Sequence, residues 1–126
     1  MKVKRKFLDL SLQRGIDAEN RLVGIIRSLR GVITWICGVR LAGVKHDRIG
    51  IDMFISIKPL EGIKNIIVPI QVKSSLKGFM SHYIKYPLST HPDILVIIVN
   101  DNYSDDNIKD YMITRLTEIR KKEAYN

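Results

Sequence analysis

Residues Ile66–Ser75 read IIVPIQVKSS, a run of β-branched residues that is typical of a buried strand but ends with a lysine. Because side chains alternate across a strand, the even-numbered residues from Ile66 to Val72 should face one way and the odd-numbered residues from Ile67 to Lys73 the other. Gln71 and Lys73 therefore share a face. An amide oxygen and an ammonium group held so close on a stiff strand are either exposed surface groups without a function or half of an active site.

The composition bounds the kind of protein. The chain has 126 residues, of which 45% are hydrophobic and 27% charged, as in a soluble globular domain without long disorder. No repeat or linker divides it, so we expect one domain over 1–126, with residues 1–12 as a basic N-terminal arm. The 21 Lys and Arg against 13 Asp and Glu give a net charge of +8, which favours nucleic acid as a partner, although a lysine excess also occurs in small proteins that bind none.

The N-terminal sequence and the single cysteine indicate the compartment. MKVKRKFLDLSL has a basic start but lacks the apolar run and cleavage site of a signal peptide. No segment approaches the roughly 18 consecutive apolar residues of a membrane span. Cys37 is the only cysteine, so no intramolecular disulfide can form, and its apolar stretch ITWICGV predicts core packing rather than a reactive thiol. We therefore expect a cytoplasmic protein that does not contact membranes.

Hydrophobic periodicity and turn residues predict the element order αβββαβα. The predicted elements are a helix over 13–30, strands over 32–39, 51–58 and 66–75, a short helix and loop over 76–90, a strand over 93–100 and a helix over 104–122. Ser104 should cap the last helix. This order predicts an α/β fold in which helices pack on a mixed sheet.

Two carboxylates interrupt apolar patterns. Glu19 lies three, four and seven residues before Leu22, Val23 and Ile26, on the apolar stripe of the first helix. Three explanations are open for its carboxylate. It reaches water at the margin of the stripe, it pairs with an arginine such as Arg14 or Arg21, or it belongs to a functional site.

Asp52 interrupts the second predicted strand, GIDMFISI, on the face of Phe54 and Ser56. Aspartate is a poor strand former, so it either caps the preceding loop or has a functional role. If the second and third strands form an antiparallel hairpin, Asp52 meets Gln71 and Lys73, and the first helix brings Glu19 over them. Two carboxylates, an amide oxygen and the Val72 carbonyl group are the hard oxygen ligands that Mg²⁺ or Mn²⁺ prefers.

This pattern resembles the PD-(D/E)XK nuclease superfamily, and within it the archaeal Holliday junction resolvases and related restriction-endonuclease-like proteins. The matching segments are RGIDAENRLV with Glu19, GIDMFI with Asp52, and IQVKSS with Gln71 and Lys73. The resemblance implies a restriction-endonuclease-like fold and a Mg²⁺-dependent endodeoxyribonuclease that acts on branched or junction DNA as a homodimer. It implies metal ligation by Glu19, Asp52, Gln71 and the Val72 carbonyl, with Lys73 beside the attacking water.

Position 71 departs from the pattern, because the family usually has Glu or Asp there and Gln removes one negative charge from the metal site. Two other functions fit the same sequence: a DNA-binding protein on the same fold with little or no catalysis, and a subunit of a larger nucleoprotein complex. Binding should be dominated by phosphate contacts, because no recognition-helix motif is visible. The residues expected to contact nucleic acid are Lys45, Arg48, Ser74, Lys77, Tyr83 and Lys85, although a solvated helix face explains the segment around Tyr83 equally well.

Overall fold

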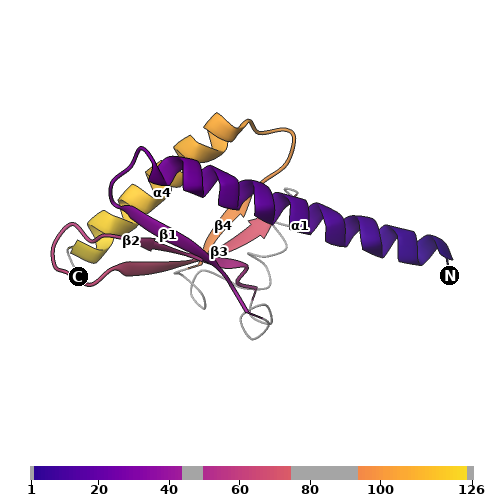
Figure 1. The fold of residues 1–126 in the computed structure, drawn as a ribbon, viewed down its shortest axis with the longest axis horizontal. Helices are drawn as coiled ribbons and strands as arrows, with labels where there is room; N and C mark the ends of the chain where they lie inside the picture. Colours follow the sequence, from indigo (N-terminus) through magenta and orange to yellow (C-terminus); the bar gives the residue numbers. More distant parts are fainter. Residues whose placement is uncertain (1, 44–49, 75–93, 125–126) are drawn as a thin grey trace.

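The computed structural model describes residues 2–43, 50–74 and 94–124 and contains a four-stranded mixed sheet and two helices (Figure 1). The described elements are α1 (Lys2–Arg30), β1 (Ile36–Leu41), β2 (Met53–Ile57), β3 (Ile66–Lys73), β4 (Leu95–Ile98) and α4 (Asp105–Ala124). The predicted α/β class and mixed sheet are confirmed. The short helix predicted over 76–90 lies outside the described residues.

The strands lie in the order β1-β2-β3-β4. β2 pairs antiparallel with both β1 and β3, and Met53 lies opposite Ile70 in the β2–β3 hairpin. β4 runs parallel to β3, with Lys73 opposite Ile98. The start of β2 and the carboxyl ends of β3 and β4 therefore lie at the same end of the sheet. Residues 52, 71 and 73 are at this end.

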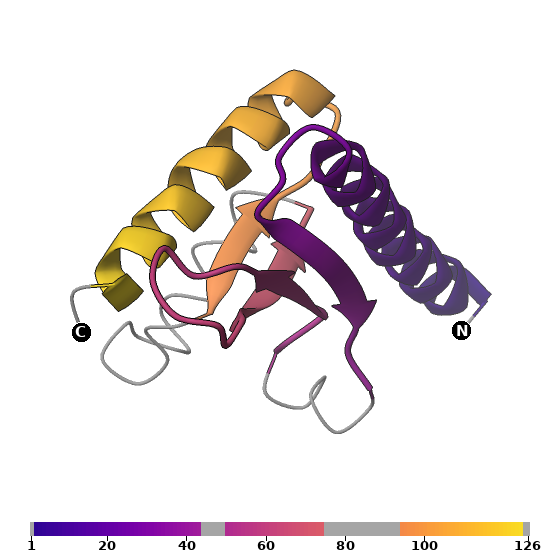
Figure 2. The same cartoon turned by 60° about the vertical axis from the view of Figure 1, so that its left-hand side comes forward.

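Both helices cover the same face of the sheet (Figure 2). The core joins Leu22 and Ile26 of α1 and Met112 of α4 to residues of β2 and β3 such as Ile55 and Ile70. All five side chains are fully buried. The predicted alternation is confirmed, because Val68 and Ile70 of β3 lie in this core whereas Gln71 and Lys73 face away from it.

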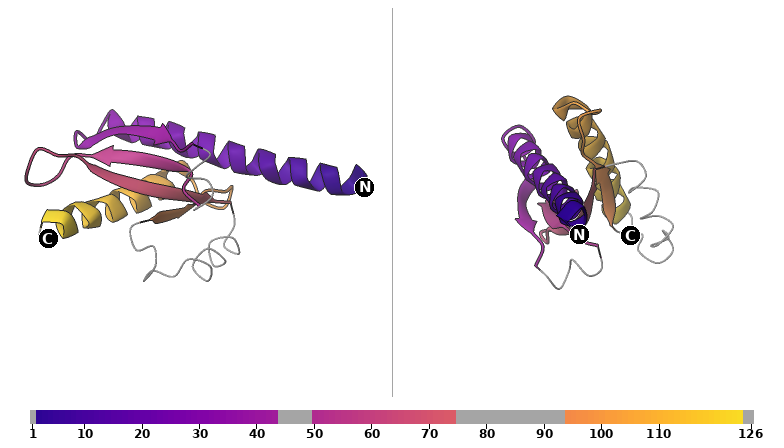
Figure 3. Two further views of the ribbon diagram at one scale, coloured as in Figure 1. Left: turned by 90° about the horizontal axis from the view of Figure 1, so that it is seen from below. Right: turned by 90° about the vertical axis from the view of Figure 1, so that its right-hand side faces the viewer.

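Helix α1 begins earlier than predicted. The sequence suggested a basic arm over residues 1–12, but the helix runs without interruption from Lys2 and extends well past the sheet (Figure 3). The correction has a local cause. The segment from Lys2 to Gln13 contains neither Gly nor Pro and consists largely of residues with good helix propensity.

Strand β1 begins four residues later than the predicted strand. Residues 31–35 close turns on the end of α1, where Val32 and Ile33 donate backbone hydrogen bonds to the Leu29 carbonyl. The β1–β2 register shifts between Ile36 and Gly38, which places Cys37 at an irregularity. Cys37 is half-buried there and is not part of the hydrophobic core, in contrast to the core packing that the sequence predicts.

Helix α4 begins as the sequence predicts. The Ser104 hydroxyl oxygen accepts a hydrogen bond from the backbone N–H of Asn107 over 3.1 Å, which is the geometry of a helix N-cap. Ser104 and Asn107 also bond through their side chains over 2.9 Å. Neither described helix has a stretch long and apolar enough to cross a membrane.

Candidate active site

Two hydrogen bonds hold Asp52 against the end of β3. Its backbone N–H donates to the Ile70 carbonyl over 2.9 Å, and its carboxylate oxygen Oδ2 accepts from the backbone N–H of Val72 over 2.7 Å. The predicted meeting of Asp52 with the end of the third strand is thus confirmed. The acceptor bond crosses to a residue 20 positions later, so Asp52 does more than cap its own loop.

Gln71 is buried at the same place. It is 8% exposed and is the single buried polar or charged side chain among the described residues. Its oxygen Oε1 is inaccessible to solvent and has no hydrogen-bond partner within the described part of the chain. A buried acceptor without a partner costs about 1–3 kcal/mol. An oxygen held in this way is a candidate ligand for a cation or for a polar substrate.

The backbone of Gly50 lies directly against this amide. A Cβ atom at Gly50 would be 3.0 Å from Gln71 Oε1 and 3.2 Å from Nε2, and Gly50 has a φ of +81°. Both features favour glycine, because L-residues rarely adopt positive φ. Sequence reasoning missed this contact, although a glycine just before the Asp-bearing strand was a visible signal.

Lys73 and the Val72 carbonyl group complete the end of β3. In an extended residue the N–H and C=O groups project to the same side of the strand. Since the Val72 N–H is directed at Asp52, the Val72 carbonyl is directed to that side as well. The Lys73 carbonyl accepts from the backbone N–H of Val99 on the opposite side, over 2.8 Å. The half-buried Lys73 side chain shares a face with Gln71, about 7 Å further along the strand.

The neighbours of Glu19 place it over this end of the sheet. Asn20 and Val23 line a cavity together with Val39 and Leu41 of β1, and the next residue, Ala42, donates its backbone N–H to the Asp52 carbonyl over 2.9 Å. Glu19 precedes Val23 by one helical turn and so lies on the same side of α1. It is half-buried. The approach of Glu19 to Asp52, Gln71 and Lys73 stays a prediction.

Arg21 has a role that sequence reasoning missed. Its guanidinium group donates to the side chain of Asp105 over 2.8 Å, and to the carbonyl oxygens of Asn100 and Tyr103 over 2.7 Å each. These bonds direct the Arg21 guanidinium group towards the β4–α4 connection. The Asn100 side chain in turn donates to the Ser74 carbonyl over 3.1 Å. Arg21 therefore ties α1 to the ends of β3 and β4.

The other predicted contacts are mostly outside the described residues. Of the six residues expected to contact nucleic acid, Ser74 alone is described, and it is exposed beside Lys73. The remaining five, with the structure of their segments, lie outside the described residues and stay predictions. Within residues 13–43, 50–74 and 94–124, no three or more His, Cys, Asp or Glu side chains gather closely enough to hold a metal. A cation here would rely on two carboxylates, an amide oxygen and a carbonyl oxygen.

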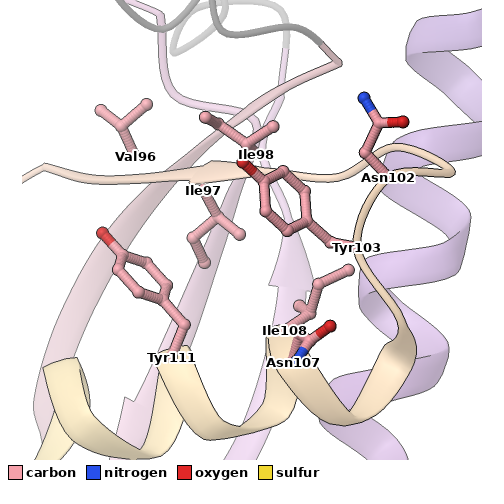
Figure 4. A pocket seen from close by; sticks show the side chains of 8 residues that line it. All are labelled: Val96, Ile97, Ile98, Asn102, Tyr103, Asn107, Ile108 and Tyr111. Atoms are coloured by element: carbon pink, nitrogen blue, oxygen red, sulfur yellow. The ribbon is translucent and has the colours of Figure 1, made fainter.

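A larger cavity, of about 550 Å³, lies between β4 and the first half of α4 (Figure 4). The rings of Tyr103 and Tyr111 flank Ile97 in this view, and each tyrosine is 41% exposed. No acidic or basic side chain is among the described residues that line it, which are Val96, Ile97, Ile98, Asn102, Tyr103, Asn107, Ile108 and Tyr111. It offers no carboxylate for a metal or a general base, in contrast to the end of the β2–β3 hairpin.

Replacing Gly50 with alanine is expected to destabilise the protein by about 2 kcal/mol or more, because a side chain there meets both positive φ and the Gln71 amide. Urea unfolding measures the free-energy change. Gly62→Ala is the matched control, since Gly62 has a φ of +96° but no heavy atom within 4 Å of its Cβ position. The difference between the two variants isolates the contact with Gln71. Equal losses would show that the amide does not constrain Gly50.

Comparisons with protein-family models, with curated proteins and with solved structures found no match to this chain. The functional interpretation therefore depends on the geometry of the site itself.

Proposed function

We propose that this protein is a metal-dependent DNA endonuclease of restriction-endonuclease-like fold that hydrolyses phosphodiester bonds. The observation that carries the proposal is the buried Gln71 oxygen without a described partner, on a hairpin that ends in Lys73 and next to Val72, whose N–H binds the Asp52 carboxylate. A buried oxygen without a partner lowers the stability of the protein, and binding of a cation or a polar ligand would explain why it is there. The net charge of +8 suits a polyanionic substrate.

The donor atoms at this end of the sheet fit Mg²⁺ or Mn²⁺. Asp52, Glu19, the Gln71 amide and the Val72 carbonyl would supply hard oxygen ligands, as these cations prefer. Two carboxylates rather than three predict weak binding, and substrate phosphate oxygens commonly complete the shell of Mg²⁺. When bound, the cation would polarise the scissile phosphate and make water a better nucleophile.

The residues of the chain have separate roles in this proposal. Lys73 is placed to stabilise negative charge that develops on the phosphate and to orient the attacking water through its ammonium protons. The Val72 N–H binds the Asp52 carboxylate over 2.7 Å. This bond fixes the orientation of the carboxylate, and with it the direction of the lone pairs that could bind a cation. Glu19 would ligate from α1, whose position Arg21 fixes.

The test is incubation of the protein with labelled linear, nicked, flap and four-way-junction DNAs in Mg²⁺, Mn²⁺ or EDTA. We expect strand cleavage with a divalent cation and none in EDTA, and the fastest substrate defines the preferred DNA structure. Gel shift in EDTA measures binding separately. Binding without cleavage on every substrate would favour a DNA-binding protein with little catalysis, and neither binding nor cleavage would favour a subunit of a larger complex.

Cleavage of both strands of a duplex or junction by one small domain calls for two sites related by a two-fold axis, so the active species is proposed to be a homodimer. Light scattering measures its mass with and without junction DNA. A complex that contains one protein chain and still cuts both strands would contradict this part of the proposal.

A further inference from the structure

A groove of about 380 Å³ lies between α1 and β1, next to the candidate active site. It is lined by Asn20, Val23, Gly24, Arg27, Val39 and Leu41. Leu41 pairs with Met53, the residue after Asp52, and Ala42 donates its backbone N–H to the Asp52 carbonyl, so one end of the groove lies near the backbone of Asp52. A strand of nucleic acid whose scissile phosphate lies at Asp52 could continue along this groove.

Arginines predominate around the groove, and Glu19, next to Asn20, is the neighbouring acid. From Asn20 to Gly43 the chain contains four arginines and no Asp or Glu. Arg21 is bound to the β4–α4 connection, whereas Arg27 and Arg30 are exposed on α1 and Arg40 is exposed on β1. Within the described residues, Arg27 makes no ion pair. This edge of the sheet is therefore positively charged.

The start of α4, which packs against α1 through Arg21 and Ser28, carries the reverse charge. Around the start of α4, residues 101–110 include the acids Asp101, Asp105, Asp106 and Asp110 and the single base Lys109. A polyanion would be repelled there and attracted to the α1–β1 edge. The α1–β1 surface and the start of α4 thus differ in the sign of charge that they attract.

Gly24 supplies an independent observation. It lies inside α1, where glycine costs about 1 kcal/mol relative to alanine. Packing does not require it, because a Cβ atom at Gly24 would have no heavy atom within 4 Å. Its φ is not positive either. A glycine that costs helix stability, has room for a side chain and lines a groove is explained if a ligand approaches the backbone closely there.

We propose that the α1–β1 groove binds the sugar–phosphate backbone of the DNA next to the scissile phosphate, with Arg27 as a phosphate contact and Gly24 as the point of closest approach. The inference rests on the proposed function in taking DNA as the ligand. Binding is measurable without divalent cations, so it stands or falls separately from cleavage.

The first experiment compares two helix glycines by fluorescence anisotropy with a labelled DNA duplex in EDTA. Gly24→Ala should raise the melting temperature by a few degrees, because alanine favours helix, and yet weaken DNA binding by about tenfold, because its methyl group occupies the groove. Gly15→Ala is the control. Gly15 also has no atom within 4 Å of its Cβ position and lies about two and a half turns earlier, on the opposite side of α1. Gly15→Ala should raise the melting temperature and leave the affinity for DNA unchanged.

The second experiment compares two exposed arginines of α1. Arg27→Gln should weaken binding by about tenfold and reduce the slope of log affinity against log salt by about 0.9, as expected for one lost phosphate contact. Arg14→Gln removes the same charge roughly 140° away around the helix. It should change affinity by about twofold or less, through screened long-range attraction.

The outcomes are decisive. Loss of affinity in Gly24→Ala and Arg27→Gln but not in the two controls supports the groove, whether or not the protein cuts DNA. Equal effects in each variant and its control, or unchanged affinity in Gly24→Ala and Arg27→Gln, would overturn it. If wild-type protein binds no DNA in EDTA or in Mg²⁺, the inference is overturned with its ligand. If DNA is bound but never cut, the endonuclease proposal alone fails.

Discussion

Lys73→Ala is expected to lower the rate of DNA cleavage by at least about 100-fold, because a positioned ammonium group acts on charge that develops only in the transition state. DNA affinity should fall little, since the Lys73 ammonium group acts mainly on charge that is absent from the bound substrate before the reaction. The fold should persist, because the contact that Lys73 makes with β4 uses its backbone carbonyl. Single-turnover cleavage and gel shift on the same DNA measure the two effects.

Lys64→Ala is the matched control for this variant. Lys64 is exposed between β2 and β3, at the other end of the hairpin, and its removal changes the net charge equally. Cleavage by Lys64→Ala should match the wild type within about twofold. If Lys73→Ala cuts DNA at the same rate as Lys64→Ala, Lys73 has no role in cleavage, and the proposed endonuclease site is wrong.

The second large effect is a pair of opposite changes in metal affinity. Gln71→Glu adds a negative charge beside the proposed cation and should tighten Mn²⁺ binding by at least about tenfold, or about 1.4 kcal/mol. Asp52→Asn subtracts a charge from the same site and should weaken it by a similar factor. Asparagine retains an oxygen that can accept the Val72 N–H bond, so the hairpin end is preserved. Calorimetric titration with Mn²⁺ measures both affinities.

The burial of position 71 sharpens this test. Without metal, Gln71→Glu places a carboxylate in a site that is 8% exposed and close to Asp52, so the free energy of unfolding should fall by about 1–3 kcal/mol. Mn²⁺ should restore it by binding the folded state. Asn65→Asp, the same change at an exposed position between β2 and β3, should show neither effect. Destabilisation that Mn²⁺ does not relieve would remove Gln71 from the metal site.

The sequence by itself determined strands β2 and β3 and the start of α4. Alternation at Ile66–Lys73 predicted which side chains face the core, and the turn residues between β2 and β3 predicted the antiparallel hairpin that brings Asp52 to Val72. Ser104 marked the start of α4. These features are local, because side-chain direction in a strand and capping of a helix depend on a few consecutive residues.

Only the tertiary structure decided how the other parts of the site are held. The partners of Arg21 lie up to 84 positions away, at Asp105, and periodicity within α1 could not distinguish them from Glu19. The packing of Gly50 on Gln71 and the groove beside Gly24 likewise join segments that are distant in sequence. The physical reason is that a residue pattern fixes the direction of a side chain relative to its own helix or strand, whereas its partner depends on how those elements pack against one another.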